Sequence, residues 1–170
     1  MTTTELVTLI ANIALTVSVI VALIFGIAQV KTAQKDRRER LTLETLRSFH
    51  SKEFAEMIHY ITRKKVPQTH EEWVAWPAAD QIEFIHFSQQ MESIGILLAE
   101  RYISVDLLDK TLGSFINANW EKFRPLVTEM REKFNDPYMS EYFQWMAEQI
   151  ERRMNEKPRT PFFMSSKRAI

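Results

Sequence analysis

An uninterrupted apolar stretch near the N-terminus constrains this 170-residue chain more than any other feature of its sequence. Residues 6–30 read LVTLIANIALTVSVIVALIFGIAQV and contain no charged side chain. About 25 such residues form a helix long enough to cross the hydrocarbon core of a bilayer with some tilt. A helix also satisfies its own backbone polar groups in lipid. The stretch therefore predicts a transmembrane anchor over residues 1–30, with the lipid bilayer as its partner.

The charges that flank this stretch predict its orientation. The short leader carries only Glu5, whereas five basic residues follow the span directly: Lys31, Lys35, Arg37, Arg38 and Arg40. Because basic flanks stay in the cytoplasm, we expect the N-terminus outside and the C-terminal domain in the cytoplasm. A cleaved signal peptide, with cleavage near residues 26–28, is the alternative. A leader without basic residues and a long apolar run argue against it.

Small and polar residues are arranged regularly along the predicted span. Small residues recur at every fourth position: Ala14, Ser18, Ala22 and Gly26. On a helix this spacing makes a smooth ridge that lets a second transmembrane helix approach closely. Asn12 lies roughly opposite, where its amide would seek a hydrogen-bond partner in hydrocarbon. We therefore expect a homo-oligomer or packing with other membrane protein subunits; the alternative is that lipid covers both rows.

Charge is unevenly distributed along the chain, although the net charge is zero. Residues 31–40 carry a net +3, residues 157–170 carry +4, and residues 41–156 carry −6. An acidic body argues against nucleic-acid binding, which needs a basic face. The absence of cysteine excludes disulfides, thiolate metal sites and cysteine nucleophiles. Three isolated glycines are too few for a glycine-rich phosphate loop.

Apolar spacing after the span is helical throughout, which predicts an all-α fold. We expect the membrane helix to continue into a basic helical stalk over residues 31–50. A small cytoplasmic bundle of four to five helices follows over 51–156, and a basic disordered tail over 157–170. The bundle helices are expected near residues 52–65, 69–77, 78–102, 105–134 and 137–156. Ser51, Thr69 and Ser104 are the expected N-caps.

Three features of these helices lead to specific expectations. The helix over 78–102 has one apolar stripe through Phe87 and Met91, and a second stripe formed by Ile82, Ile85 and Ile96. Apolar residues on two faces predict a central, largely buried helix. Pro125 is expected to kink or restart the helix over 105–134. Asp136 and Pro137 are expected to cap and begin the last helix.

Two E-x-x-H motifs raise the question of a di-metal site: Glu56 with His59, and Glu83 with His86. Di-iron helix bundles use two such pairs together with two inward glutamates from other helices. At about 100° per residue, Glu56, His59 and His86 all lie well away from the main apolar stripes. A membrane-tethered di-metal enzyme using these four residues is therefore the alternative function. No catalytic residue and no cofactor is expected.

Three segments of the chain carry a resemblance. They are LRSFHSKEF (46–54), FSQQMESIGILLAERYIS (87–104) and WEKFRPLVTEMREKFNDPYMSEYFQWMAE (120–148). Together they resemble the bacterial domain-of-unknown-function 4760 family, over nearly the whole chain. The resemblance implies one N-terminal membrane span, a small helical domain and a location in the bacterial inner membrane. The family has no established activity, so the resemblance implies no catalytic residue.

Glu92, Trp120 and Arg124 are the polar positions in these segments that we expect to matter structurally. Glu92 lies at the boundary of the core, and a buried acid needs a partner. We expect Glu92 to pair with Arg124 or to accept a hydrogen bond from Trp120, as a bundle-stabilising contact rather than part of a ligand pocket.

The sequence as a whole predicts a single-pass membrane protein that acts by binding, as a scaffold, an accessory subunit or a regulator of a membrane complex. Nothing in it is a positive sign of an enzyme.

In the tail, Phe162, Phe163 and Met164 stand among basic residues. Such a segment suits the anionic inner leaflet or a protein partner, with a plain frayed terminus as the alternative.

Overall fold

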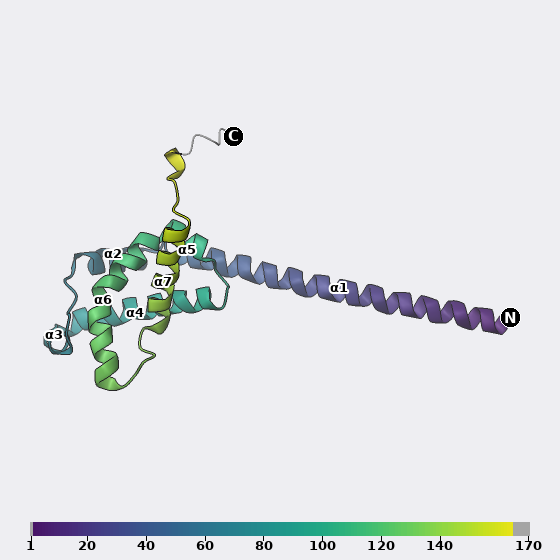
Figure 1. Cartoon of the computed structure of the whole chain (residues 1–170), viewed down its shortest axis with the longest axis horizontal. Helices are drawn as coiled ribbons and strands as arrows, with labels where there is room; N and C mark the ends of the chain where they lie inside the picture. The colour runs from purple at the N-terminus through teal and green to yellow at the C-terminus, as the bar shows by residue number, and fades with distance from the viewer. Residues whose placement is uncertain (1, 165–170) are drawn as a thin grey trace. The chain divides into compact units, whose positions relative to one another are not determined.

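A computed structural model describes residues 2–164, except for the side chains of Glu5 and Phe162. This part contains seven α-helices, a short 3-10 helix and no strand (Figure 1), so the predicted all-α class is confirmed. The α-helices are α1 (Thr3–Ser48), α2 (Lys52–Arg63), α3 (His70–Ala75), α4 (Ala78–Ala99), α5 (Val105–Thr111), α6 (Gly113–Phe134) and α7 (Glu141–Glu156). The 3-10 helix η1 (Phe162–Met164) follows them. Residues 165–170 of the predicted tail lie outside the described residues.

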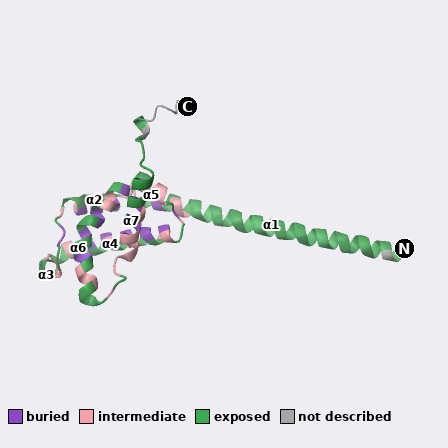
Figure 2. Cartoon of the chain, in the orientation of Figure 1, coloured by how far each residue is buried: buried purple, intermediate pink, exposed green. Residues whose placement is uncertain are grey.

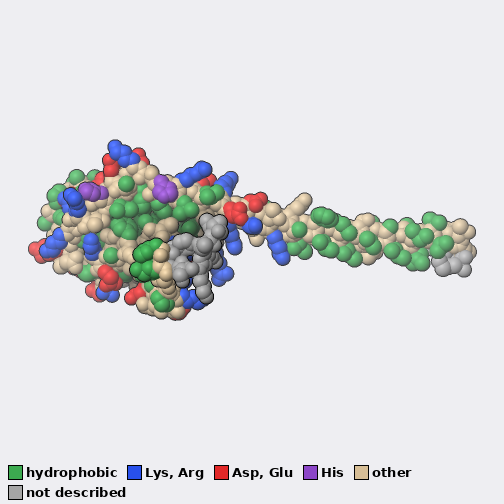
Figure 3. All heavy atoms as spheres, turned by 90° about the horizontal axis from the view of Figure 1, so that it is seen from above, with side chains coloured by type: hydrophobic (Ala, Val, Ile, Leu, Met, Phe, Trp, Pro, Cys, Tyr) green, Lys and Arg blue, Asp and Glu red, His purple; other side chains and the backbone are tan. Residues whose placement is uncertain are grey.

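The first of two compact units ends at Leu41 and consists of most of α1. Thr8, Thr16 and Ser18 each donate a side-chain hydrogen bond to the carbonyl oxygen four residues earlier. This part of α1 is exposed (Figure 2). Many of its side chains are apolar, and charged side chains follow toward its C-terminal end (Figure 3). In the described part of the chain, one helix is long and apolar enough to cross a membrane, a property that signal sequences share.

The second unit, the body, begins inside α1 at Thr42, earlier than the predicted boundary at residue 51. Thr42 Oγ1 donates to the main-chain oxygen of Tyr102 at 3.4 Å, and Thr45 is buried. Phe49 packs against the core just after α1 ends. The last turns of α1 are therefore part of the body, because their polar and aromatic side chains reach inward.

Aromatic side chains form the centre of the body. α7 packs against α4, α5 and α6, and α2 packs against α4. Phe87, Phe123 and Phe143 are fully buried, one from each of α4, α6 and α7. Phe84 stacks on Phe123 with ring centroids 4.2 Å apart, and Phe87 meets Phe143 edge-on at 5.7 Å. Burying each such side chain stabilises the fold by roughly 1.5–3 kcal/mol, so this cluster fixes how the three helices pack.

The second apolar stripe of α4 faces outward, so the prediction that α4 is buried on two faces is wrong. Ile82, Ile85 and Ile96 are 64%, 46% and 43% exposed, whereas Phe87 and Met91 are fully buried. The neighbouring helices pack on the stripe that contains Phe87 and Met91. Spacing alone predicts that a face is apolar, but it does not say whether this chain covers that face.

Two predicted helix boundaries differ from the structure. α6 runs continuously through Pro125, which is exposed, and the break lies earlier, at Leu112. Proline has no N–H to donate, so the carbonyl of Glu121, four residues earlier, loses its helical partner. On an exposed face, water can reach that carbonyl, which lowers the cost of keeping Pro125 inside the helix. Because Leu112 separates α5 from α6, the described chain has six α-helices after α1 instead of the predicted four to five.

The last helix begins at Glu141, four residues later than predicted. Asn135 and Ser140 have positive φ angles of 50° and 54°, and the residues between them form a turn. Asp136 Oδ1 accepts a hydrogen bond from the Tyr138 amide at 3.0 Å, so it stabilises this turn rather than the start of α7. The three predicted N-caps are confirmed: Ser51, Thr69 and Ser104 accept from the amides of Phe54, Glu72 and Leu107.

Gly95 allows α4 and α7 to approach each other closely. A Cβ atom at this position would lie 2.5 Å from the main-chain oxygen of Tyr142. We predict that Gly95→Ala lowers the free energy of unfolding by about 1–3 kcal/mol, because the backbone of α7 must move away. Urea denaturation measures this, with Ser93→Ala on the exposed side of α4 as the control. Equal effects of the two substitutions would contradict the prediction.

Candidate functional site

A groove on the body is a candidate functional site. It has a volume of about 770 Å³, within the range of small-molecule and peptide sites. Residues of α3, α4 and α6 and of the turn before α7 line it, and we call it the α3/α4/α6 groove. Its apolar lining residues include Trp73, Phe84, Ile85, Val127, Met130 and Phe134. Its polar lining residues on α4 are Ser88, Gln89, Glu92 and Ser93.

Hydrogen bonds from neighbouring helices hold the α3 side of the groove in place. Glu129 Oε1 on α6 accepts from the His70 amide at 3.0 Å, which ties the first turn of α3 to α6. Gln81 Nε2 on α4 donates to the main-chain oxygens of Trp73 and Trp76 at 3.1 and 2.8 Å. The Trp73 ring then meets Phe84 edge-on at 4.9 Å. These contacts position one aromatic wall of the groove.

Glu92 joins the groove to the start of α7. Its Oε1 accepts from the Phe143 amide at 2.7 Å, and its Oε2 accepts from the Tyr142 amide at 3.3 Å. Ser140, the residue before α7, is in the left-handed conformation and makes no side-chain cap. Glu92 therefore caps the N-terminus of α7 from a different helix, where a negative charge is also favoured by the helix dipole.

This arrangement differs from the pairing predicted for Glu92, although its role as a structural acceptor is the one expected. Arg124 pairs instead with Glu121 at 2.8 Å on the exposed surface of α6. Trp120 is buried, and its ring meets Phe143 edge-on at 5.3 Å. Main-chain amides are the partners of Glu92 because the turn before α7 brings them within reach, a contact that side-chain patterns in the sequence do not reveal.

Burial raises the pKa of Glu92 above its ordinary value, since desolvation disfavours the charged carboxylate. The Phe143 and Tyr142 amides and the charge of Arg131 oppose this shift, and Glu141 adds to it.

A second polar cluster links α2 to α4: Tyr60 donates to Asp80, and Lys64 pairs with Asp80 at 2.9 Å. These two hydrogen bonds lower the pKa of Asp80. Burial and Asp80 raise the pKa of Tyr60.

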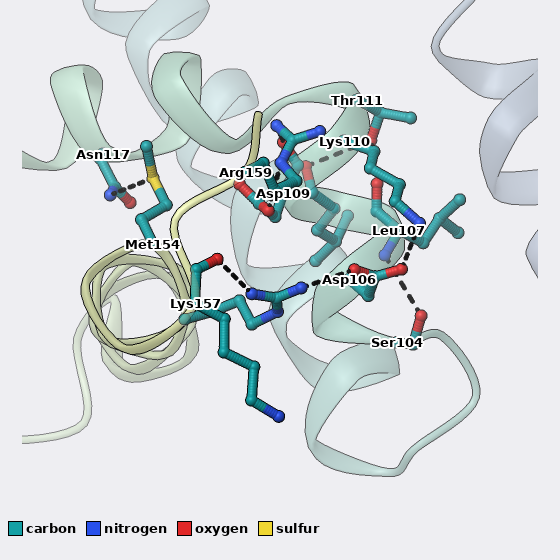
Figure 4. A network of polar contacts seen from close by, with 12 residues as sticks. Ser104, Asp106, Leu107, Asp109, Lys110, Thr111, Asn117, Met154, Lys157 and Arg159 are labelled. Carbon is teal, nitrogen blue, oxygen red and sulfur yellow. Dashed lines mark hydrogen bonds and ion pairs between the residues drawn. The ribbon is translucent and has the colours of Figure 1, made fainter. Parts of the chain in front are cut away.

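A third polar cluster connects α5 with the end of α7 (Figure 4). Arg153 pairs with Asp106 at 3.0 Å and also donates to the main-chain oxygen of Lys157 at 2.6 Å. Arg159 Nε lies 2.7 Å from Asp109 Oδ2, and Arg159 also donates to the Asp109 main-chain oxygen at 2.7 Å. The Asp109 side chain is only 1% exposed. Arg159 therefore holds the beginning of the C-terminal segment against α5 by compensating a buried charge.

The two E-x-x-H motifs lie on different helices and do not form one site. Glu56 and His59 are exposed on α2, where Glu56 pairs with Lys52 at 3.3 Å. Glu83 is half-buried on α4, and His86 is exposed beside Gln90. Among the described residues, there is no group of three or more His, Asp or Glu side chains that could hold a metal ion.

The residues predicted to pack in a membrane lie together on α1. Ala14, Ser18, Ala22 and Gly26 share one helix face and are exposed, and a Cβ atom at Gly26 would meet nothing within 4 Å. Asn12 is exposed, as are the flanking basic residues Lys31, Lys35, Arg37, Arg38 and Arg40. Lys35 pairs with Glu39 at 3.6 Å. The packing roles of these residues stay predictions.

The fold thus defines a class of protein: an all-helical body with an apolar groove, preceded by a helix that can be a membrane span or a signal sequence. Residues 16–150 match the family described as domain of unknown function DUF4760, and the chain belongs to this family. Neither the curated proteins nor the solved structures contain a match to the chain.

We predict that Glu92→Ala lowers the free energy of unfolding by about 1–2 kcal/mol near neutral pH. The substitution leaves two amides at the start of α7 without their acceptor. Urea denaturation measures the loss, and Glu121→Ala, which removes an exposed acid from α6, is the control. A loss no larger than that of the control would show that Glu92 does not cap α7.

The raised pKa of Glu92 also predicts a pH dependence. The folded state holds the Glu92 proton more tightly than the unfolded chain, so this group's stabilisation is complete below its ordinary pKa of 4.5. The extra stability due to protonation is lost as the pH rises through the raised pKa of the folded state, while the hydrogen bonds to the two α7 amides remain. Glu92→Gln removes this titration, so its stability relative to the unmodified chain should increase across that interval.

Proposed function

We propose that this protein is a single-pass protein of a bacterial inner membrane, with its N-terminus outside and its body in the cytoplasm. We further propose that it acts by binding, as a scaffold, an accessory subunit or a regulator of a membrane complex, with the α3/α4/α6 groove as its recognition surface. The length and apolar composition of α1 support the membrane anchor.

The observation that carries the binding function is the exposed apolar surface of the groove. Ile85 and Phe134 line it and are exposed, and the exposed Ile82 continues the apolar surface along α4. Apolar surface of this kind typically marks an interaction site, because leaving it in water is unfavourable. An open groove with few polar side chains is suited to hold an apolar segment of a partner.

The ionisable groups whose pKa values are shifted support a binding function more than a catalytic one. The carboxylate of Glu92 accepts from two amides of α7, and that of Asp80 accepts from Tyr60 and Lys64. Both sets of partners connect helices of the body, so they stabilise the fold that shapes the groove. The large exposed apolar part of α1 supports the anchor, with its small-residue ridge available to neighbouring helices.

The chain has no cysteine, so single introduced cysteines can test its topology without a background. We predict that a membrane-impermeant maleimide labels Thr3→Cys in intact spheroplasts and labels Lys157→Cys only after lysis. Mature protein that lacks the Thr3→Cys label because its N-terminus has been removed would show that α1 begins with a signal peptide. The reverse labelling pattern would overturn the proposed orientation.

A photo-reactive residue in the groove tests recognition. We predict that the residue at Ile85 forms one dominant protein crosslink in native membranes, because a partner covers this exposed apolar position. The matched control places the same residue at Arg124, which is exposed on α6 outside the groove. Mass spectrometry identifies the product. Similar, low yields from Ile85 and Arg124 would contradict the assignment of the groove as a recognition surface.

A further inference from the structure

Charge near the α3/α4/α6 groove restricts what can occupy it. Three segments contain all of its lining residues: 70–76 on and beside α3, 83–93 on α4, and 127–141 from α6 to the start of α7. Each segment carries a net charge of −2. Together they account for the whole −6 of residues 41–156. The remainder of residues 41–156 is neutral overall, so the excess negative charge of this range lies on the three segments, and Glu92 is the charged residue among the lining side chains.

An apolar groove carried by acidic segments favours an occupant that is both apolar and basic, because complementary charge steers and orients association. The C-terminal segment, residues 157–170, has this composition. It carries four basic and no acidic residues around the sequence PFFM. Phe163 and Met164 are 84% and 63% exposed, so the body of the same chain leaves them uncovered.

The geometry places Phe163 away from the groove of its own chain. The 3-10 helix that contains Phe163 follows the C-terminal end of α7 (Figure 1), whereas Ser140, which lines the groove, directly precedes the N-terminal end of α7. The 16 residues of α7 are about 24 Å long. Phe163 is the fourth residue after Arg159, which α5 holds through Asp109, and a step of four extended residues spans at most about 14 Å.

We propose that the α3/α4/α6 groove binds the C-terminal segment of a second copy of this chain, with Phe163 and Met164 in the apolar part. This inference rests on the proposed function of the groove as a recognition surface, and it identifies the partner. Anchors in the same membrane would raise the effective concentration of one copy near another, so a short segment suffices for binding.

The test uses the full chain, anchored in lipid nanodiscs, with a photo-reactive residue at Phe163. Isotopically heavy and light copies are mixed before reconstitution. We expect crosslinks between heavy and light copies that map to residues 83–93 or 127–141. Because the contact is partly electrostatic, raising the salt concentration from about 0.05 to 0.5 M should lower the yield several-fold.

Two substitutions at one position distinguish the effect of charge on binding from the effect of side-chain size. Ser93 is an exposed groove residue on α4. Ser93→Arg places a like charge against the basic segment and should lower the yield at least about tenfold, whereas Ser93→Glu should keep it. Circular dichroism verifies that both variants fold. Equal yields from Ser93→Arg and Ser93→Glu would overturn the proposal.

The remaining outcomes are equally decisive. Crosslinks confined to single copies, or to lipid, or to surfaces outside the groove would overturn the proposal. If Phe163 gives no product between copies while Ile85 in native membranes crosslinks to a different protein, the proposed recognition function stands and this partner is wrong. If neither position gives a product, both proposals fail.

Discussion

The body depends on the close contact between α4 and the first turn of α7. Gly95 leaves room for the Tyr142 backbone, and one helical turn away Glu92 accepts the Tyr142 and Phe143 amides. Each feature needs the other, because the carboxylate reaches these amides only where the helices approach closely. The contact also brings Phe143 into the aromatic cluster with Phe87 and Phe123. Polar capping and core packing therefore specify one position for α7.

The same contact shapes the α3/α4/α6 groove. When α7 is fixed on α4, the preceding turn places Ser140 Oγ 3.3 Å from Ser88 Oγ, and Met139 and Ser140 close one side of the groove. Glu92 belongs both to the cap and to the groove lining. A partner that fills the groove would further desolvate this carboxylate and favour its protonated form. The proposed binding at the groove would thus be linked to the protonation of Glu92 by the architecture of the body.

Periodicity predicted the helices and the core stripe through Phe87 and Met91, because helical spacing and burial are encoded locally. N-caps at Ser51, Thr69 and Ser104 were also predictable, since each contact spans three residues. The partners of Glu92 could not be predicted, because they are main-chain amides about 50 residues away along the chain. The exposure of Ile82 and Ile85 was missed for another reason: an apolar stripe looks the same whether this chain or another covers it. The groove combines these two non-local features, so side-chain patterns could not reveal it.

The outward stripe of α4 has a physical consequence for how such a protein can work. A body that exposes Ile82, Ile85 and Ile96 would associate indiscriminately if apolar contact were its only means of recognition. In the proposed function, the negative charge of the groove segments would provide discrimination, since acidic segments would be repelled and basic apolar ones attracted. Confinement to a membrane would reduce the affinity that each contact needs, because anchored partners meet at high effective concentration. A small apolar groove formed by acidic segments would then be sufficient for selective binding.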